Sequence, residues 1–169
     1  MKNILIISAT LNNNYSLSKA LSDYLKELDM ESTIISLENY KLPIYTDQVF
    51  DTEKNDYKKT IESLTQHFIN HRGLIICGPE YNGSIPPIIN NAIAWISTST
   101  DYWRDAFKDK VALIGTSSGG NGSKFIITMK TQLEHLGCVV MPRSISANDS
   151  NPLDRKSTTK ILKQFIKFL

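Results

Sequence analysis

The sequence predicts an α/β fold, a doubly wound parallel sheet of five strands with helices on both faces. Short apolar runs alternate with helical patterns along the whole 169-residue chain. The runs at 4–7 and 74–77 are apolar throughout, which is typical of parallel strands covered on both faces. Polar, glycine-containing loops follow several of these runs, where an open α/β sheet binds its ligands.

Five strand–helix units are expected, and right-handed crossovers between them fit the strand order 2-1-3-4-5. Ser16 and Ser123 are suitable N-cap residues, and Gly137 is a natural helix stop. Residues 38–54 form the longest predicted irregular loop, a length typical of functional or mobile loops. Without repeats or linkers, residues 1–169 are expected to form a single domain. The expected strands are 3–8, 33–37, 73–77, 111–115 and 138–141, and the expected helices are 16–28, 55–70, 86–97, 123–136 and 154–168.

Composition and charge exclude several classes of partner. The chain is 41% hydrophobic and 21% charged, and its net charge of +2 gives no basis for a nucleic-acid partner. Cys77 and Cys138 do not form a disulfide framework or a Cys-x-x-Cys motif. No apolar run approaches the roughly 18 residues that span a bilayer, and the first residues lack a secretory segment. We therefore expect a reduced, cytoplasmic protein without a membrane partner.

Three loops are expected to meet at one edge of the sheet, because parallel strands end there together. Loop 1 (residues 9–16) carries short hydroxyl and amide side chains and opens a helix, whose free N–H groups favour phosphate. It lacks both the Gly-x-Gly-x-x-Gly and the Gly-Lys-Ser/Thr patterns of nucleotide-binding loops. Loop 2 (79–84) contains Asn82 and Gly83, and loop 3 (115–123) contains several glycines. These residues let the backbone of both loops approach a ligand. Each loop alone is an ordinary polar connection, but together they indicate a planar, phosphorylated ligand.

At these residues the chain resembles the NADPH-dependent FMN reductase family, a flavodoxin-like group that includes quinone, azo-dye and chromate reductases. The run Pro-Glu-Tyr-Asn-Gly-Ser-Ile-Pro at 79–86, with Asn91, Ala92 and Trp95 after it, is similar to the most specific signature of that family. Residues 42–45 resemble its Leu-Pro-x-Tyr loop, and residues 117–122 resemble its Ser-x-Gly-Gly-x-Gly loop. The resemblance extends from the first strand through Pro142 and implies FMN and NAD(P)H as cofactors.

The resemblance also implies which residues bind FMN. Loop 1 would hold the phosphate, loop 2 would line the isoalloxazine, and loop 3 would touch its other edge. The implied residues are Thr10, Asn12, Ser16, Leu17, Ser18, Pro79, Glu80, Tyr81, Asn82, Gly83, Ser117, Ser118, Gly119 and Gly120.

Loop 1 departs from the family pattern Gly-Ser-x-Arg-x-x-Ser-x-Asn. Ala9 replaces the glycine, Asn12 the arginine and Ser18 the asparagine, and one extra residue precedes Ser16. Losing the arginine removes a charge-assisted phosphate contact, and no Lys or Arg stands between residues 3 and 17. FMN is therefore expected to bind more weakly than is typical, or to exchange like a substrate.

The function implied is hydride transfer from NAD(P)H to FMN and on to a small acceptor by a ping-pong mechanism. Free flavin, quinones, azo compounds and metal oxyanions all stay open as acceptors. The flavin carries the chemistry, so no catalytic side chain is expected. A homodimer or homotetramer is expected from the resemblance. Two alternatives are a flavodoxin-type electron carrier and a flavin-binding module without NAD(P)H activity.

Other candidate residues are weaker. His67 and His71 have the spacing of a metal pair but no third ligand nearby, so no metal site is predicted. Cys77 is expected to be a buried small side chain, with a redox role as the minor reading. Two readings stay open for the aromatic residues before the fourth strand, which either cover a neighbouring subunit's flavin or anchor their own loop. These residues are Tyr102, Trp103 and Phe107. The candidate cations for a cofactor phosphate are Arg104, Lys108 and Arg143, and the sequence does not choose among them.

Overall fold

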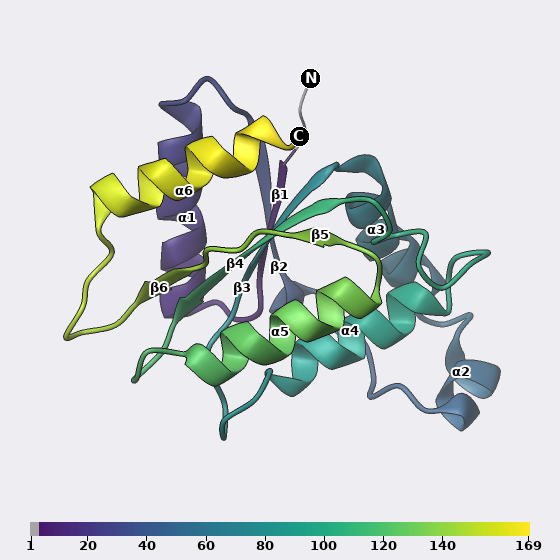
Figure 1. The fold of residues 1–169 in the computed structure, drawn as a ribbon. Helices are drawn as coiled ribbons and strands as arrows, with labels where there is room; N and C mark the ends of the chain where they lie inside the picture. The colour runs from purple at the N-terminus through teal and green to yellow at the C-terminus, as the bar shows by residue number, and fades with distance from the viewer. Residues whose placement is uncertain (1–3) are drawn as a thin grey trace.

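The structure is a computed structural model that describes residues 4–169, and its elements alternate between strands and helices (Figure 1). Asn3, which the sequence places in the first strand, lies outside the described residues. The strands are β1 (Ile4–Ser8), β2 (Ser32–Ser36), β3 (Gly73–Cys77), β4 (Val111–Ser117), β5 (Val139–Val140) and β6 (Ile145–Ala147). The helices are α1 (Asn13–Lys26), η1 (Leu37–Asn39), α2 (Asp47–Glu53), α3 (Lys58–Asn70), α4 (Pro87–Ser97), α5 (Ser123–His135) and α6 (Arg155–Lys167).

The parallel sheet has the order β2-β1-β3-β4-β5, which confirms the predicted 2-1-3-4-5 arrangement. One strand was not predicted, since β6 also pairs with β4. The start of β4 pairs with β5 and its end, Gly115–Ser117, pairs with β6. Pro142 lies between these two short strands, and a proline has no N–H to donate to a ladder. The single strand expected at 138–141 is therefore shorter, and the pairing resumes after the proline.

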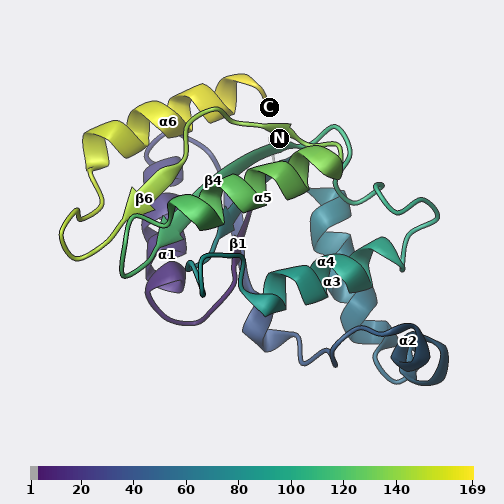
Figure 2. The ribbon, with the colours of Figure 1, turned by 60° about the horizontal axis from the view of Figure 1, so that its bottom comes forward.

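Alternate residues of the strands separate into two hydrophobic cores. Ile4 and Ile6 of β1 pack with α1 and α6 on one face of the sheet, whereas Leu5 and Ile7 pack with α3, α4 and α5 on the other. The two layers of helices are visible on either side of the sheet in Figures 1 and 2. Burial on both faces explains why these strands have continuous apolar sequences.

The helix starts differ from the expected ones. The side chain of Asn12 caps α1 by accepting a hydrogen bond from the Asn14 N–H, so the helix begins three residues before Ser16. Ser123 is the first residue of α5, and Gly122 precedes it with a left-handed φ of 64°. Gly137 ends α5 as predicted, with φ 90°. The segment 38–54 is not wholly irregular, because it contains most of η1 and all of α2.

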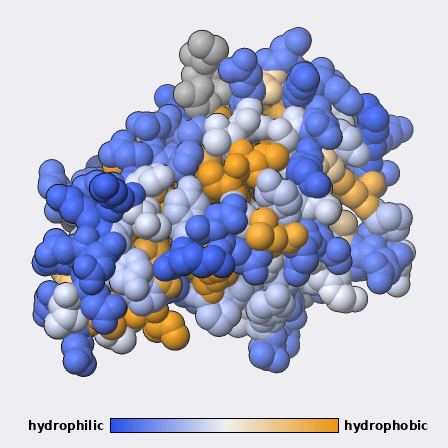
Figure 3. Space-filling model, turned by 180° about the vertical axis from the view of Figure 1, so that it is seen from behind, coloured by the Kyte–Doolittle hydropathy of each residue, from blue (hydrophilic) through white to orange (hydrophobic). Residues whose placement is uncertain are grey.

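The surface seen from behind is mostly hydrophilic, with separate apolar patches (Figure 3). Within residues 4–169, no helix combines the length and apolar character needed to cross a membrane.

Gly122→Ala should destabilise the protein by about 2 kcal/mol, because the residue has a left-handed backbone and no room for a side chain. A Cβ atom at this position would lie 2.6 Å from Cγ2 of Thr116. Gly119→Ala is the matched control, since a Cβ there meets nothing within 4 Å. Urea unfolding of both variants tests this, and equal free energies of unfolding would contradict it.

Candidate functional site

Loops 1, 2 and 3 lie side by side because backbone hydrogen bonds continue the sheet pairing into them. The Ala9 N–H donates to the carbonyl oxygen of Cys77 at 2.8 Å, which ties the start of loop 1 to the end of β3. The Gly78 N–H donates to the carbonyl oxygen of Gly115 at 3.2 Å, which ties the segment before loop 2 to loop 3. The edge predicted from the sequence therefore exists as one continuous surface.

A buried side chain, Asn14, joins loop 1 to loop 3. Its Nδ2 donates to the Ser117 carbonyl and its Oδ1 accepts from the Ser117 N–H, both at 2.9 Å. Asn14 is only 1% exposed, so both halves of its amide are matched to one backbone residue away from water. The sequence analysis missed this residue, because a run of three asparagines does not show which one turns inward.

Glu80 joins loop 2 to loop 3 and to the start of α5. Its N–H donates to Oγ of Ser118 at 2.8 Å, and Ser118 shares a second hydrogen bond with Thr116. The Glu80 carboxylate accepts from the Lys124 N–H at 3.0 Å and the Phe125 N–H at 3.5 Å. A carboxylate at a helix N-terminus satisfies free N–H groups and interacts favourably with the helix dipole. The α5 N-terminus thus holds an anion from the chain itself.

Loop 2 forms a tight turn that presents its backbone and one aromatic ring. Asn82 and Gly83 have φ values of 50° and 71°, as the sequence predicted, and Tyr81 and Ser84 exchange two backbone hydrogen bonds. The Tyr81 side chain is 44% exposed. Lys124 lies over this turn, since a Cβ on Gly83 would be 3.4 Å from its Nζ. Lys124 is a cation at this edge that the sequence analysis did not identify.

The predicted residues of loop 1 divide into two groups. Asn12 and Ser16 are exposed, whereas Thr10 is buried and its hydroxyl donates to Oδ1 of Asn12 at 2.5 Å. Leu17 and Ser18 are buried, and the Ser18 hydroxyl donates to the Asn14 carbonyl at 2.8 Å within α1. The structure therefore places Asn12 and Ser16 at the surface, but it turns Leu17 and Ser18 inward.

In loop 3, the structure leaves open space above two glycines. Neither Gly119 nor Gly120 has an atom within 4 Å of where a side chain would begin. Asn148 holds this segment in place, with its Nδ2 donating to the Gly120 carbonyl at 3.0 Å. A ligand can approach this backbone closely.

The remaining residues of the signature have a structural explanation. Asn91 and Trp95 of α4 both donate to the carbonyl oxygen of Pro43 at 2.9 Å. Asn91 also accepts from the Tyr45 N–H at 2.7 Å. These bonds fasten the Leu-Pro-Ile-Tyr segment, residues 42–45, to α4, so the two sequence motifs are in direct contact.

The other aromatic and basic candidates lie before β4 or, in the case of Arg143, between β5 and β6. Phe107 is fully buried in the core, so this residue anchors its own loop instead of covering a neighbouring subunit's flavin. The Arg104 guanidinium lies 4.3 Å from the centre of the Trp103 ring. Lys108 also precedes β4, at the opposite edge of the sheet, and Arg143 donates to Oγ of Ser157 at 3.1 Å.

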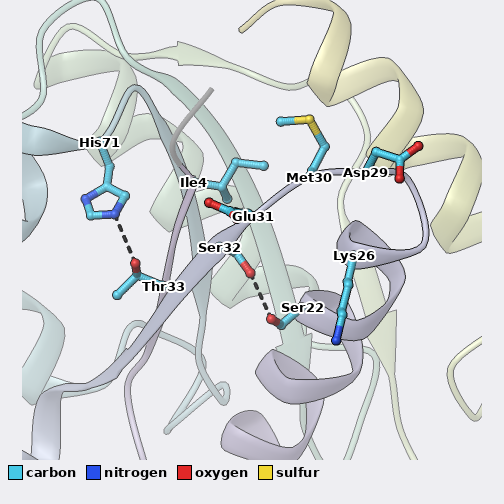
Figure 4. Close-up of a pocket in the computed structure, with 9 residues that line it drawn as sticks. All are labelled: Ile4, Ser22, Lys26, Asp29, Met30, Glu31, Ser32, Thr33 and His71. Atoms are coloured by element: carbon cyan, nitrogen blue, oxygen red, sulfur yellow. Dashed lines mark hydrogen bonds between the residues drawn. The ribbon is translucent and has the colours of Figure 1, made fainter. Parts of the chain in front are cut away.

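A cavity of about 710 Å³ lies at that opposite edge and includes His71 but none of the predicted site residues (Figure 4). His71 Nε2 is 3.3 Å from the Thr33 hydroxyl, and its Nδ1 is 2.6 Å from the His67 carbonyl oxygen. Burial, and then the nearby His71, lower the pKa of His67. Over the described part of the chain, no three potential metal ligands come together.

Cys77 is fully buried beneath loop 1, and burial raises the pKa of its thiol to about 12. A thiol that stays protonated inside the core is a poor nucleophile. The structure therefore favours a packing role for Cys77 over a redox role.

Asn14→Ala should lower the free energy of unfolding by about 2 kcal/mol, because the half-buried Ser117 N–H and carbonyl both lose their side-chain partner. It should also weaken FMN binding, since loops 1 and 3 lose their connection. Asn13→Ala, at the neighbouring exposed residue, is the control. Urea unfolding and quenching of flavin fluorescence measure the two effects, and a variant indistinguishable from the control would show that Asn14 does not hold loops 1 and 3 together.

Neither cysteine should react with Ellman's reagent in the native protein at pH 8, because burial raises the pKa of Cys138 to about 12 as well. Both should react in urea. An unfolded thiol ionises near pH 9.0 but the folded ones only near 12, so the free energy of unfolding should fall as the pH rises from 9.0 to 12. Rapid labelling of the native protein would show that a thiol is accessible.

Several known oxidoreductases are similar to this chain. An FMN-dependent NADPH-azoreductase of Staphylococcus aureus is 28% identical over 154 residues, which cover 89% of this chain and 79% of that protein. A quinone reductase of Escherichia coli is 31% identical over 102 residues, covering 59% of this chain and 52% of that protein. The flavoenzyme FerB of Paracoccus denitrificans, an NAD(P)H:acceptor oxidoreductase, superposes with a TM-score of 0.74 at 21% identity, covering 99% and 95% of the two chains.

A profile of the NADPH-dependent FMN reductase family matches residues 2–151, which include all three loops. This match confirms the resemblance found at the loop 2 signature. The chain belongs to the NADPH-dependent FMN reductase family, a family of oxidoreductases that use FMN and NADPH.

Proposed function

We propose that this protein binds FMN at the edge formed by loops 1, 2 and 3 and passes hydride from NAD(P)H through it to a small electron acceptor. The observation that carries the proposal is the connection of the three loops by Asn14, Ser118 and Glu80, which leaves the backbone of loops 2 and 3 open beside them. Such a fixed, exposed backbone suits a flat, polar ring system.

The proposed binding residues follow the three loops. Thr10, Asn12 and Ser16 would bind the phosphate, and Leu17 and Ser18, which are buried residues of α1, would anchor the start of that helix in the core. The segment from Pro79 to Gly83 lines the isoalloxazine on one side. Ser117, Ser118, Gly119 and Gly120 line its other edge. In this proposal, residues 1–169 act as a single FMN-binding domain.

The chain contributes position and electrostatics to the reaction. Bound FMN supplies the hydride-transfer chemistry. Backbone N–H groups of loops 2 and 3 would stabilise negative charge at this edge, and Lys124 adds a positive charge beside Gly83. No side chain is assigned as an acid, base or nucleophile. We expect donor and acceptor to occupy the same place in turn, which would give ping-pong kinetics.

The acceptor, assembly and location belong to the proposal as well. Quinones and azo compounds are candidate acceptors because the similar Escherichia coli and Staphylococcus aureus proteins are named for them. Free flavin and metal oxyanions are further candidates from the sequence. We propose a homodimer or homotetramer in the cytoplasm.

An electron carrier is the second candidate, since an archaeal flavodoxin shares the fold with a TM-score of 0.66. That likeness, at 11% identity, concerns the fold alone. The match to the reductase family favours the enzyme.

Anaerobic stopped-flow mixing of the FMN-loaded protein with NADPH should bleach the flavin absorbance, at a rate that saturates with NADPH. Quinone and azo acceptors, added afterwards, should restore the absorbance. The same mixing with NADH shows which nicotinamide is preferred. Bound FMN that neither nicotinamide bleaches would favour the electron carrier, and no flavin binding would refute the site.

A further inference from the structure

We propose that Glu38 is a specificity-determining residue whose carboxylate disfavours the flavin phosphate at loop 1. As a result, FMN and riboflavin bind with nearly equal affinity. This inference rests on the proposed flavin site. It concerns which flavin the site selects. Measuring FMN and riboflavin binding side by side distinguishes a failure of the Glu38 inference from a failure of the proposed site.

The position of Glu38 follows from the pairing of β1 with β2. Ser8 and Ser36 are partners in the register, and both strands end at these residues. Thr10 and Glu38 therefore lie equally far past the ends of two neighbouring strands. Leu37 is buried in the core and fixes η1 at this edge, and the Glu38 carboxylate accepts a hydrogen bond from the Leu11 N–H.

Three hydrogen-bond donors of loop 1 are already taken by side-chain oxygens of the chain. The Leu11 N–H donates to the Glu38 carboxylate. The Thr10 hydroxyl and the Asn14 N–H both donate to Oδ1 of Asn12, at 2.5 and 3.3 Å. A phosphate that binds this loop must compete with one neutral and one charged oxygen for these donors.

No cation within loop 1 itself offsets the charge of Glu38. The chain has no Lys or Arg between residues 3 and 17, and Lys19 lies over the Tyr15 ring, 5.5 Å from its centre. Lys41 borders the same cavity of about 350 Å³ as Glu38 and Leu11. The two ion pairs found in the described part of the chain, Lys58–Glu62 and Arg155–Glu27, involve neither Glu38 nor Lys41.

Repulsion from Glu38 acts on FMN but not on riboflavin. The two flavins share the isoalloxazine and the ribityl chain, and only FMN carries a phosphate of nearly two negative charges. A carboxylate beside that group weakens binding, whereas a neutral ligand in the same place is unaffected. The ratio of the two dissociation constants therefore isolates the effect of Glu38 on the phosphate.

The test is Glu38→Gln, which keeps an oxygen to accept from the Leu11 N–H and removes only the charge. We expect FMN to bind about tenfold more tightly, as one nearby charge at a partly exposed site allows, and riboflavin to change less than about twofold. Flavin fluorescence quenching at low salt measures both constants. Raising the salt to about 0.5 M should reduce the gain in FMN affinity, because exposed charges are then screened.

Glu31→Gln is the matched control. Glu31 precedes the other end of β2, so the variant makes the same change in net charge at the opposite edge of the sheet. Glu38→Ala removes the hydrogen bond as well as the charge, and it should also favour FMN over riboflavin. Thermal unfolding of each variant confirms that the fold is kept.

Two results would overturn the inference while leaving the flavin site in place. One is that Glu38→Gln changes FMN and riboflavin binding equally, or changes FMN binding no more than Glu31→Gln does. The other is a wild-type protein that prefers FMN over riboflavin by about a thousandfold. If neither flavin binds the wild-type protein, the proposed function fails, and the inference fails with it.

Discussion

The in-register pairing of β1, β3 and β4 is the constraint on which the site depends. Ser8, Cys77 and Gly115 are neighbours across the three strands, so β1 and β3 end at the same level and β4 ends only two residues further on, at Ser117. Burial of these strands on both faces keeps the register from slipping, because a shift by one residue would move every side chain into the other core. The loops meet because the strands beneath them cannot move independently.

Polar side chains then convert three neighbouring loops into one rigid surface. Asn14 and Glu80 each connect two loops, and they do so with backbone groups that would otherwise lack partners. A buried amide matched at both ends has no alternative arrangement of similar energy. The open backbone at Gly119 and Gly120 is therefore held in position. A preformed binding site requires such an arrangement.

The sequence predicted the parts of this structure that depend on local pattern. Periodicity located the strands and the main helices, and Asn82-Gly83 predicted the tight turn. It did not select Asn12 over Ser16 as the helix cap, because several neighbouring polar residues suit that role equally. Asn14 and Glu38, and the contacts by which Glu80 joins loop 2 to α5, were beyond its reach for another reason. Their partners lie 103, 27 and 44 residues away, and only the folded sheet brings them together.

The charges at this edge are arranged unusually for a site that holds a phosphorylated flavin. The family pattern has an arginine in loop 1, whereas this chain has Asn12 there and a carboxylate, Glu38, bonded to the neighbouring residue. Its positive charge lies instead at loop 2, where Lys124 covers Gly83. Attraction is therefore stronger at the ring end of the proposed ligand than at the phosphate end. In the proposed binding mode, a flavin held mainly by its rings would exchange readily, so the same edge would also suit a flavin that enters oxidised and leaves reduced.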